Sequence, residues 1–262
     1  MQVISFCLFY PEKSNISYEY FLGLLYNLEL RKQFFSEWYI HLHVSLRLKR
    51  HPLIQYVQAD PMCIIFWRKE KGLEHDKLWR YEPFFNPQVK VCIARDVDSF
   101  LTLRDRFHVD QWLQHRLVKR RNSWLVYTEY TMEGAAMGGG IGYKGTLKLS
   151  DYNTAILQED IFGTLDENFL YFLQKAAPAL EYRVVLRMDE AGQYFEIYSE
   201  GVTTEPYILA NVKPHVQTRK AIVLGHAAEI PSCQFYSLKR LLWSGATIPQ
   251  LSPKVSLYEW ER

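Results

Sequence analysis

Apolar runs alternate with amphipathic segments along the first quarter of the chain. Residues 3–9 form an apolar run that ends before a proline, which predicts a buried strand followed by a turn. Over residues 18–35 apolar side chains recur at intervals of three and four, which predicts an amphipathic helix. Residues 39–46 and 54–57 then read as strands. The resulting β-α-β order predicts a right-handed crossover with parallel pairing.

The same pattern continues through the middle of the chain. Residues 89–94 form another strand-like run that leads into Asp96-Val97-Asp98. A helix is expected next, because its apolar positions share one stripe; they are Val109, Trp112, Leu113 and Leu117. Residues 124–127 read as a strand, and a glycine cluster follows at 138–142.

A third helix is predicted around Phe169, Leu173 and Ala176, and strands at 194–199 and 221–224. Together these elements predict an α/β fold with a Rossmann-type central sheet, mixed but mostly parallel, flanked by helices. The 262 residues fit a single domain.

Composition narrows the possible partners and the compartment. The chain has 31 basic and 29 acidic residues, so no overall field favours nucleic acid. No run approaches the roughly 20 apolar residues that span a bilayer, and residues 1–10 lack the features of a secretory signal. The four cysteines are widely separated, without metal-ligand spacing, which favours a reducing, cytoplasmic compartment. Aromatic residues make up 15% of the chain, which suits a well-filled core or stacking on sugar or base rings.

Asp96 and Asp98 are the strongest candidates for chemistry. They follow an apolar strand, and in open α/β sheets ligands bind at the carboxyl ends of the strands. A bend there can turn both carboxylates toward one cation. Mg²⁺ and Mn²⁺ favour a few carboxylates together with substrate phosphates. A solvated pair of loop carboxylates is the alternative.

The sequence around this pair resembles a known family. The matching segments are Phe66-Trp67-Arg68, Leu78-Trp79-Arg80-Tyr81-Glu82-Pro83, Arg95-Asp96-Val97-Asp98-Ser99, Arg104-Asp105-Arg106 and Val109-Asp110-Gln111-Trp112-Leu113. They resemble GT-A glycosyltransferases of large DNA viruses, notably algal viruses, and of bacteria that decorate surface glycans. The family's later glycine turn and G-x-D-[EQ]-x-F-L element are matched by residues 138–140 and 163–170, the second with one extra residue. The resemblance covers roughly residues 3–175.

This resemblance implies a single GT-A-like domain, with a nucleotide-binding half at about residues 1–100 and an acceptor half at about 101–262. It also implies a UDP- or GDP-sugar donor, Mn²⁺ or Mg²⁺, and transfer of a hexosyl or deoxyhexosyl group to a glycan or similar hydroxyl. No nucleic acid and no membrane span are expected. If the chain is viral, the compartment would be the host cytoplasm.

The resemblance also suggests roles for residues of the donor and metal sites. Asp98 is expected to bind the metal, and Asp96 the ribose or the metal. Arg80 and Arg95 are expected either to meet phosphate or to form structural ion pairs. Phe9, at the end of the first strand, is placed in the donor site.

Gly138 and Gly139 would let backbone amides approach the sugar, or would simply form a tight turn. His226, after a strand-like run, is a candidate late metal ligand, with a surface histidine as the alternative. For an inverting reaction, Asp166 is the candidate general base and Glu167 the second choice. Helix capping is the alternative role for both carboxylates.

Two other functions remain open at this stage. The first is a nucleotidyltransferase, although residues 11–15 lack the glycine-rich loop that would hold a triphosphate. The second is a carbohydrate- or protein-binding module that has lost turnover. It is kept because the segment from Tyr127 to Glu133 departs from the family pattern. The family has a His-Ile-Met-Arg-Asp-His-like segment where this chain has residues 125–130, and a Met-Trp-Gly continuation where it has residues 140–142.

Overall fold

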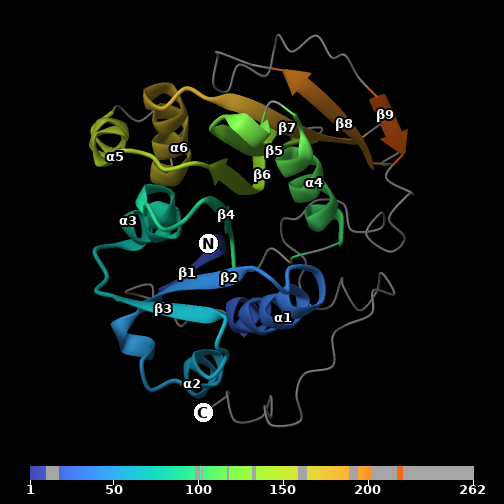
Figure 1. Ribbon diagram of the computed structural model, residues 1–262. Coiled ribbons are helices and arrows are strands. Elements are labelled where there is room, and N and C mark those ends of the chain that lie inside the picture. Colours follow the sequence, from blue (N-terminus) through green and yellow to red (C-terminus); the bar gives the residue numbers. More distant parts are fainter. Residues whose placement is uncertain are drawn as a thin grey trace.

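The computed structural model describes residues 1–9, 18–97, 101, 103–116, 118–131, 134–158, 164–188, 194–201 and 217–220. The strands are β1 Gln2–Leu8, β2 Tyr39–Ser45, β3 Cys63–Arg68, β4 Val91–Arg95, β5 Ser123–Thr131, β6 Gly134–Lys144, β7 Leu180–Met188, β8 Tyr194–Gly201 and β9 Gln217–Lys220. They form one sheet in the order β3-β2-β1-β4-β6-β5-β7-β8-β9 (Figure 1).

Most strands of the sheet run in the same direction. β1 pairs in parallel with β2 and β4, β2 with β3, and β5 with β7. Only β6 and β8 among the described strands run opposite to the others. The predicted fold class, an α/β fold with a mixed, mostly parallel sheet flanked by helices, is therefore confirmed. The expected parallel pairing of the first two strands is also confirmed.

Helices cover both faces of the sheet. They are α1 Tyr18–Phe34, α2 Pro52–Gln58, α3 Leu73–Lys77, α4 Leu103–Gln114, α5 Leu149–Ile156 and α6 Leu165–Ala176, with the 3₁₀ helices η1 Leu46–Leu48, η2 Leu78–Phe85 and η3 Val118–Arg120. Apolar side chains of α1, α2 and α4 pack in one cluster, and those of η2, α5 and α6 in another.

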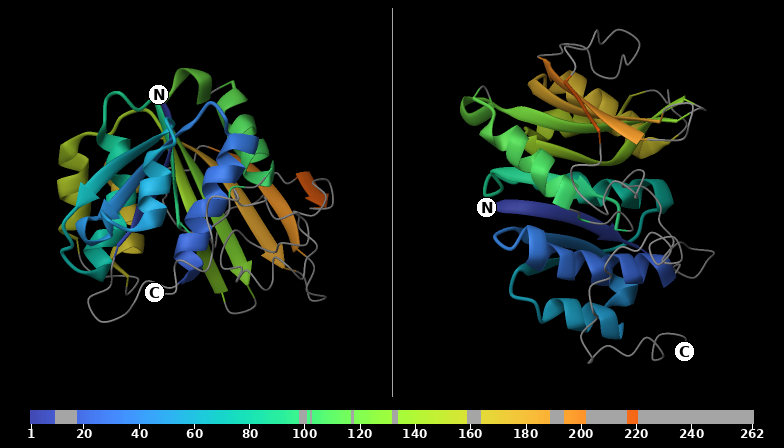
Figure 2. Two further views of the ribbon diagram at one scale, coloured as in Figure 1. Left: turned by 90° about the horizontal axis from the view of Figure 1, so that it is seen from below. Right: turned by 90° about the vertical axis from the view of Figure 1, so that its right-hand side faces the viewer.

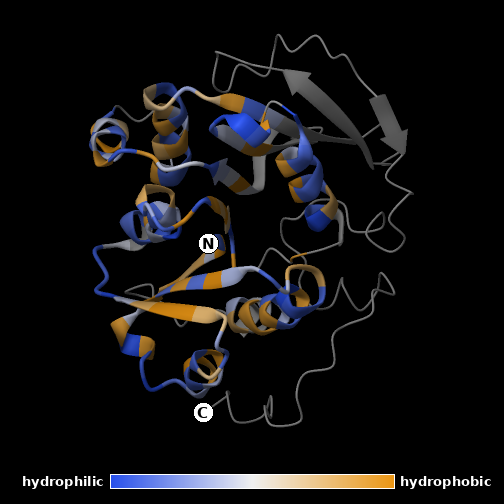
Figure 3. Ribbon diagram, viewed as in Figure 1, coloured by the Kyte–Doolittle hydropathy of each residue, from blue (hydrophilic) through white to orange (hydrophobic). Residues whose placement is uncertain are grey.

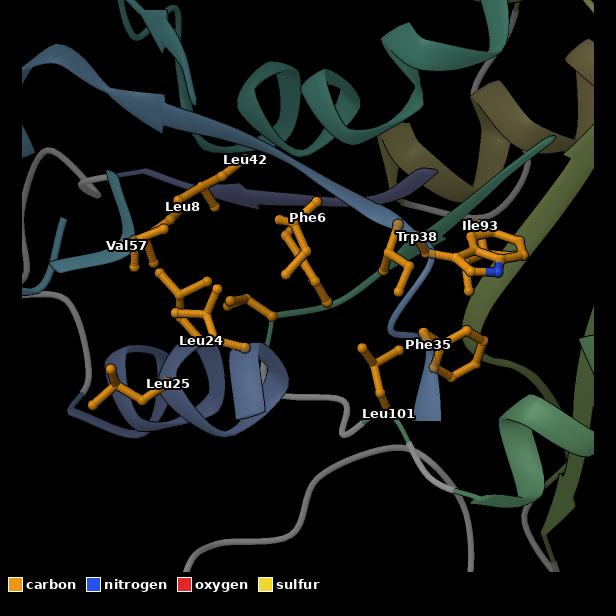
Figure 4. Close-up of a cluster of buried hydrophobic side chains, with 14 of the residues drawn as sticks. Phe6, Leu8, Leu24, Leu25, Phe35, Trp38, Leu42, Val57, Ile93 and Leu101 are labelled. Carbon is orange, nitrogen blue, oxygen red and sulfur yellow. The ribbon is translucent and has the colours of Figure 1, made fainter. Parts of the chain in front are cut away.

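Alternation along β1 assigns its side chains to the two clusters. Ile4, Phe6 and Leu8 join the cluster under α1, whereas Val3 joins the cluster under η2. Figure 4 shows Phe6 and Leu8 above Leu24 of α1 in the first cluster. Strands β1 and β3 carry mainly hydrophobic residues (Figure 3). β1 is buried along nearly its whole length, as expected for a strand covered on both faces, whereas the edge strand β3 is only partly buried.

Two sequence predictions for local structure are wrong. Residues 54–57, expected as a strand, lie in helix α2. Pro52 opens that helix, and His51 Nδ1 accepts a hydrogen bond from the Leu53 N–H at 3.3 Å. Residues 138–140, where the resemblance implies a glycine turn, lie inside strand β6. The predicted strand at 221–224 lies outside the described residues.

None of the described helices combines the length and the apolar character needed to cross a lipid bilayer.

Candidate functional site

The carboxyl ends of four neighbouring parallel strands define one edge of the sheet. β1, β2, β3 and β4 end there at Leu8, Ser45, Arg68 and Arg95. Asp96 follows β4 directly, and its side chain is 34% exposed. The first carboxylate of the Asp96-Val97-Asp98 motif therefore lies at the edge where ligands of α/β proteins bind.

Arg80 brings two of the predicted site carboxylates together. Its Nη1 donates to Asp96 Oδ1, and its Nη2 donates to Asp166 Oδ2 at 2.9 Å. Asp96 is 16 positions from Arg80 in the sequence and Asp166 is 86 positions away. One guanidinium thus links η2, the end of β4 and the start of α6.

This cluster contains more than one positive charge. Lys77 Nζ lies 3.9 Å from Asp166 Oδ1 and donates to Glu74 Oε1 at 2.9 Å. Although burial alone would lower the pKa of Arg80, nearby Tyr81, Cys7 and Asp166 favour its charged form and raise that pKa overall. Arg80 is therefore a permanent cation between the two carboxylates.

The end of β1 lies next to the residues that carry this cluster. The Cys7 thiol points to the Lys77 carbonyl at 3.8 Å, and burial raises the pKa of Cys7 to about 11. A neutral, buried thiol is a poor nucleophile, so Cys7 acts here as a small apolar residue. Phe9 meets Trp79 edge to face, with ring centroids 6.0 Å apart. Phe9, which was predicted to lie in the donor site, therefore contacts Trp79, the residue directly before Arg80.

The two candidate bases on α6 have different partners. Asp166 faces Arg80, as described, and its side chain is 13% exposed. Glu167 Oε2 instead accepts a hydrogen bond from Thr164 Oγ1 at 2.9 Å, at the helix N-terminus. The carboxylate of Glu167 is engaged in the capping region of its own helix, while that of Asp166 belongs to the site cluster.

Arg95 forms a buried ion pair, which is one of the two arrangements considered for it. It is 1% exposed and forms an ion pair with Asp105 of α4, which is fully buried. A Cβ added at Gly140 would lie 2.6 Å from Arg95 Cδ and 2.7 Å from Cζ. Gly140 therefore lets β6 pass directly against the Arg95 side chain.

Gly138 and Gly139 lie two and one positions before Gly140 in the same strand. Because they are part of β6, they do not form the tight turn that was the alternative role considered for them. The glycine cluster instead coincides with the place where β6 approaches β4, since Gly140 pairs with Arg95.

Sequence reasoning missed Asn27 of α1. This residue is fully buried; its Nδ2 donates to the Val97 carbonyl at 2.9 Å, and its Oδ1 accepts from the Leu101 N–H at 2.9 Å. One amide therefore holds the backbone on both sides of residues 98–100. The available signal was a polar residue among the apolar positions Leu24, Leu25 and Leu28.

The predicted metal site is only partly within the described residues. Asp98 and His226 lie outside them. Across the described part of the chain, no group of three or more His, Cys, Asp and Glu side chains is arranged to hold a metal ion.

A polar network lies at the ends of β2 and β3, beside this cluster. Arg68 Nη2 lies 3.2 Å from His43 Nδ1 and also donates to Glu82. Burial, with the nearby Arg68 charge, lowers the pKa of His43 well below its ordinary value. Burial also lowers the pKa of His41, on the same strand, to about 4. Both imidazoles are therefore neutral near pH 7.

No protein-family model matches the sequence, and no curated protein matches it. Similar solved structures include 4-diphosphocytidyl-2C-methyl-D-erythritol synthase from Anaerococcus prevotii, at 10% identity over 73% of this chain and 91% of that chain, with a TM-score of 0.45. A putative nucleotide-diphospho-sugar transferase from Desulfovibrio desulfuricans has 11% identity over 70% and 79%, with a TM-score of 0.42. A putative glucose-1-phosphate thymidylyltransferase from Bacillus anthracis has 9% identity over 75% and 89%, with a TM-score of 0.45. At these identities and scores, the likeness assigns neither a family nor a function to this chain.

Proposed function

We propose that this chain is a metal-dependent glycosyltransferase of GT-A type that moves a sugar from a UDP- or GDP-sugar to a hydroxyl of a glycan or similar acceptor. The observation that carries the proposal is the Arg80 link between Asp96 and Asp166. Three residues that the family resemblance singles out, far apart in sequence, meet at the ligand-binding edge of the sheet.

Asp96 and Asp98 are proposed to hold Mn²⁺ or Mg²⁺. The donor set fits, because Asp96 is partly exposed at the strand end and Asp98 follows two residues later in the sequence. When bound, the cation would neutralise charge on the leaving nucleoside diphosphate. His226 is proposed as a further ligand.

Arg80 is proposed to act on the donor and on the geometry of the site. Its fork holds the Asp96 and Asp166 carboxylates in fixed positions, and it adds positive charge where the diphosphate must accumulate negative charge. Phe9, next to Trp79, is proposed to contact the donor nucleotide at the end of β1. The backbone at Gly138 and Gly139 is proposed to approach the sugar.

Asp166 is proposed as the general base that accepts the acceptor hydroxyl proton. Its place in the Arg80 cluster supports this role over Glu167, which already accepts a hydrogen bond from Thr164. Glu167 remains the second choice. The transferred group is proposed to be a hexosyl or deoxyhexosyl group. The chain is proposed to form a single domain over residues 1–262 and to act in the cytoplasm.

One observation favours a second candidate, a non-catalytic carbohydrate- or protein-binding module. The charge of Asp96 is already balanced by Arg80, so the protein can hold this cluster together without a metal. In such a module the cluster would be structural, and a nucleotide-sugar would neither bind through a metal nor be turned over.

A thermal-shift screen tests the proposal and separates the candidates. UDP-, GDP- and TDP-sugars are compared with and without Mn²⁺, because a ligand that binds only the folded state raises the melting temperature. Asp98→Ala is the test variant. Asp110→Ala is the matched control, since Asp110 pairs with Arg106 on α4, outside the cluster.

Metal-dependent stabilisation by one donor class, lost in Asp98→Ala and retained in Asp110→Ala, is the expected result. In a parallel screen with a nucleoside triphosphate and a sugar phosphate, formation of a nucleotide-sugar and pyrophosphate would indicate a nucleotidyltransferase instead. If no nucleotide shifts the melting temperature, the transferase proposal is wrong and the binding module becomes the better reading.

A further inference from the structure

The sheet edge opposite the candidate site carries a concentration of positive charge. We name this set of residues the basic edge; it comprises Lys90, Arg116, Lys119, Arg120, Arg121 and Lys144. Five of the six side chains are exposed, and Lys144 is partly exposed. They come from four segments: the residue before β4, the turn after α4, η3 with the residue after it, and the end of β6.

Hydrogen bonds show that these segments lie side by side. Lys144 Nζ donates to the Arg121 carbonyl at 3.0 Å, and the Gly145 N–H donates to the Lys90 carbonyl at 3.0 Å. The Lys90 N–H in turn donates to the Met1 carbonyl at 2.9 Å, at the start of β1. Figure 2 shows the start of β1 at the same edge as the segments that lead into β4 and β5.

These charges are not balanced by nearby acids. Among the described residues, no carboxylate forms an ion pair with any member of the basic edge. Asp151, the acid that follows β6, accepts from the Lys148 N–H at 2.9 Å at the start of α5, and Glu181 is 8% exposed. An uncompensated cluster of this kind attracts a polyanion or an anionic surface.

An exposed leucine favours a membrane as that partner. Four residues after Gly145 the chain reaches Leu149, which is 68% exposed and follows the exposed Lys148. Leu149 begins the helix that follows the basic edge, since the Gly145 N–H bonds to the Lys90 carbonyl. Basic side chains together with a protruding apolar one are typical of proteins that bind the surface of an anionic bilayer. Single-stranded nucleic acid would instead use exposed aromatic rings for stacking. The large exposed apolar side chains of the described chain include only one aromatic, Tyr20 of α1.

We infer that the basic edge docks the protein on an anionic phospholipid surface, with Leu149 entering the interface. This goes beyond the proposed transferase function and does not depend on it. Because the basic edge lies at the amino end of β4 and the candidate site at its carboxyl end, the docked protein keeps that site turned away from the lipid. A substrate in solution can therefore reach the site while the protein is bound.

Vesicle flotation tests the inference on the full chain. Vesicles of phosphatidylcholine alone are compared with vesicles that also contain phosphatidylserine, at low and at raised salt. Binding is expected only with the anionic lipid, and raised salt should weaken it because salt screens exposed charges. The double variant Lys119→Ala/Arg120→Ala should bind roughly tenfold more weakly or worse, and Leu149→Ser should also bind more weakly.

Lys49→Ala/Arg50→Ala is the matched control, because it removes the same two charge types from exposed positions beside η1. It should bind like the parent, as should Asp98→Ala, so the result stands whether or not the chain is a transferase. Thermal melts confirm that each variant is folded. Equal binding by both double variants, binding to neutral vesicles, or binding to an RNA or DNA oligonucleotide but not to vesicles would overturn the inference.

Discussion

Arg80 Nη2 donates to Asp166 Oδ2 at 2.9 Å, so a residue of η2 is joined to the first turn of α6 across 86 positions of sequence. The same guanidinium also pairs with Asp96, at the end of β4. Removing it leaves two carboxylates close together without their shared cation. Arg80 is therefore the residue on which the arrangement of the cluster depends most.

Arg80→Met should destabilise the protein by about 2–4 kcal/mol, because Asp96 loses its ion pair and the mostly buried Asp166 keeps only the more distant Lys77. Urea denaturation measures this loss. Arg80→Met/Asp166→Asn should cost less than the sum of the two single variants, since both disrupt one interaction. Strictly additive losses would show that the two side chains do not stabilise each other.

Asp166→Asn and Glu167→Gln should separate the two candidate bases. If Asp166 accepts the acceptor proton, Asp166→Asn should lower the turnover number by roughly 10²–10⁴-fold while donor binding changes little. Glu167→Gln should mainly weaken the start of α6, by about 1 kcal/mol or less. Steady-state kinetics and donor titration on both variants provide the comparison. The reverse ranking of turnover numbers would move the role to Glu167.

Gly140→Ala should force the Arg95 side chain out of place. The added methyl group would lie 2.6 Å from Arg95 Cδ, too close for an ordinary contact. We expect a loss of about 1–3 kcal/mol in the free energy of unfolding. The same substitution in an Arg95→Leu/Asp105→Leu background should cost less, because the long side chain is gone. An equal cost in both backgrounds would place the strain elsewhere.

Asn27→Leu keeps the side-chain size but removes the amide that holds Val97 and Leu101. It leaves a buried carbonyl and a buried N–H without this partner, which should cost about 2–4 kcal/mol. Hydrogen exchange is the sharper measurement: the Leu101 amide should lose protection, whereas amides in β2 should not. Unchanged protection at Leu101 would mean that another group satisfies this N–H.

Parts of the fold could be predicted from the sequence because their hydrophobic patterns are compatible with only one type of secondary structure. Continuous apolar runs predicted β1 and β4, and the stripe on residues 109–113 predicted α4. The apolar run at 54–57 is too short to distinguish a strand from a helix. The helix α2 forms there because Pro52 occupies its first turn and His51 caps its N-terminus. The strand at the glycine cluster could not be predicted in this way, because Gly140 is required by a side chain on another strand, Arg95.

The site was predictable to a similar degree. Motif residues Arg80, Asp96 and Asp166 do meet in space, but their ion pairs depend on how η2 and α6 pack over the sheet, and no local pattern encodes that packing. Asn27 acts on backbone groups about 70 residues away. Its role could therefore not be recognised before the fold was known.

The buried histidines predict how stability depends on pH. Burial lowers the pKa of His41 from 6.5 to about 4, with a further contribution from the N-terminal charge. The unfolded chain therefore binds a proton at a higher pH than the folded chain. Stability from this group is complete above about pH 6.5 and is lost as the pH falls toward 4, by about 1.4 kcal/mol per pH unit.

Urea denaturation at several values of pH should show this slope, to which His43 also contributes. His41→Gln should reduce the slope between about pH 6.5 and 4, since one proton no longer binds preferentially to the unfolded chain. His75→Asn, which removes an exposed histidine outside β2, is the control. An unchanged slope in His41→Gln would show that the folded protein does not lower the pKa of this imidazole.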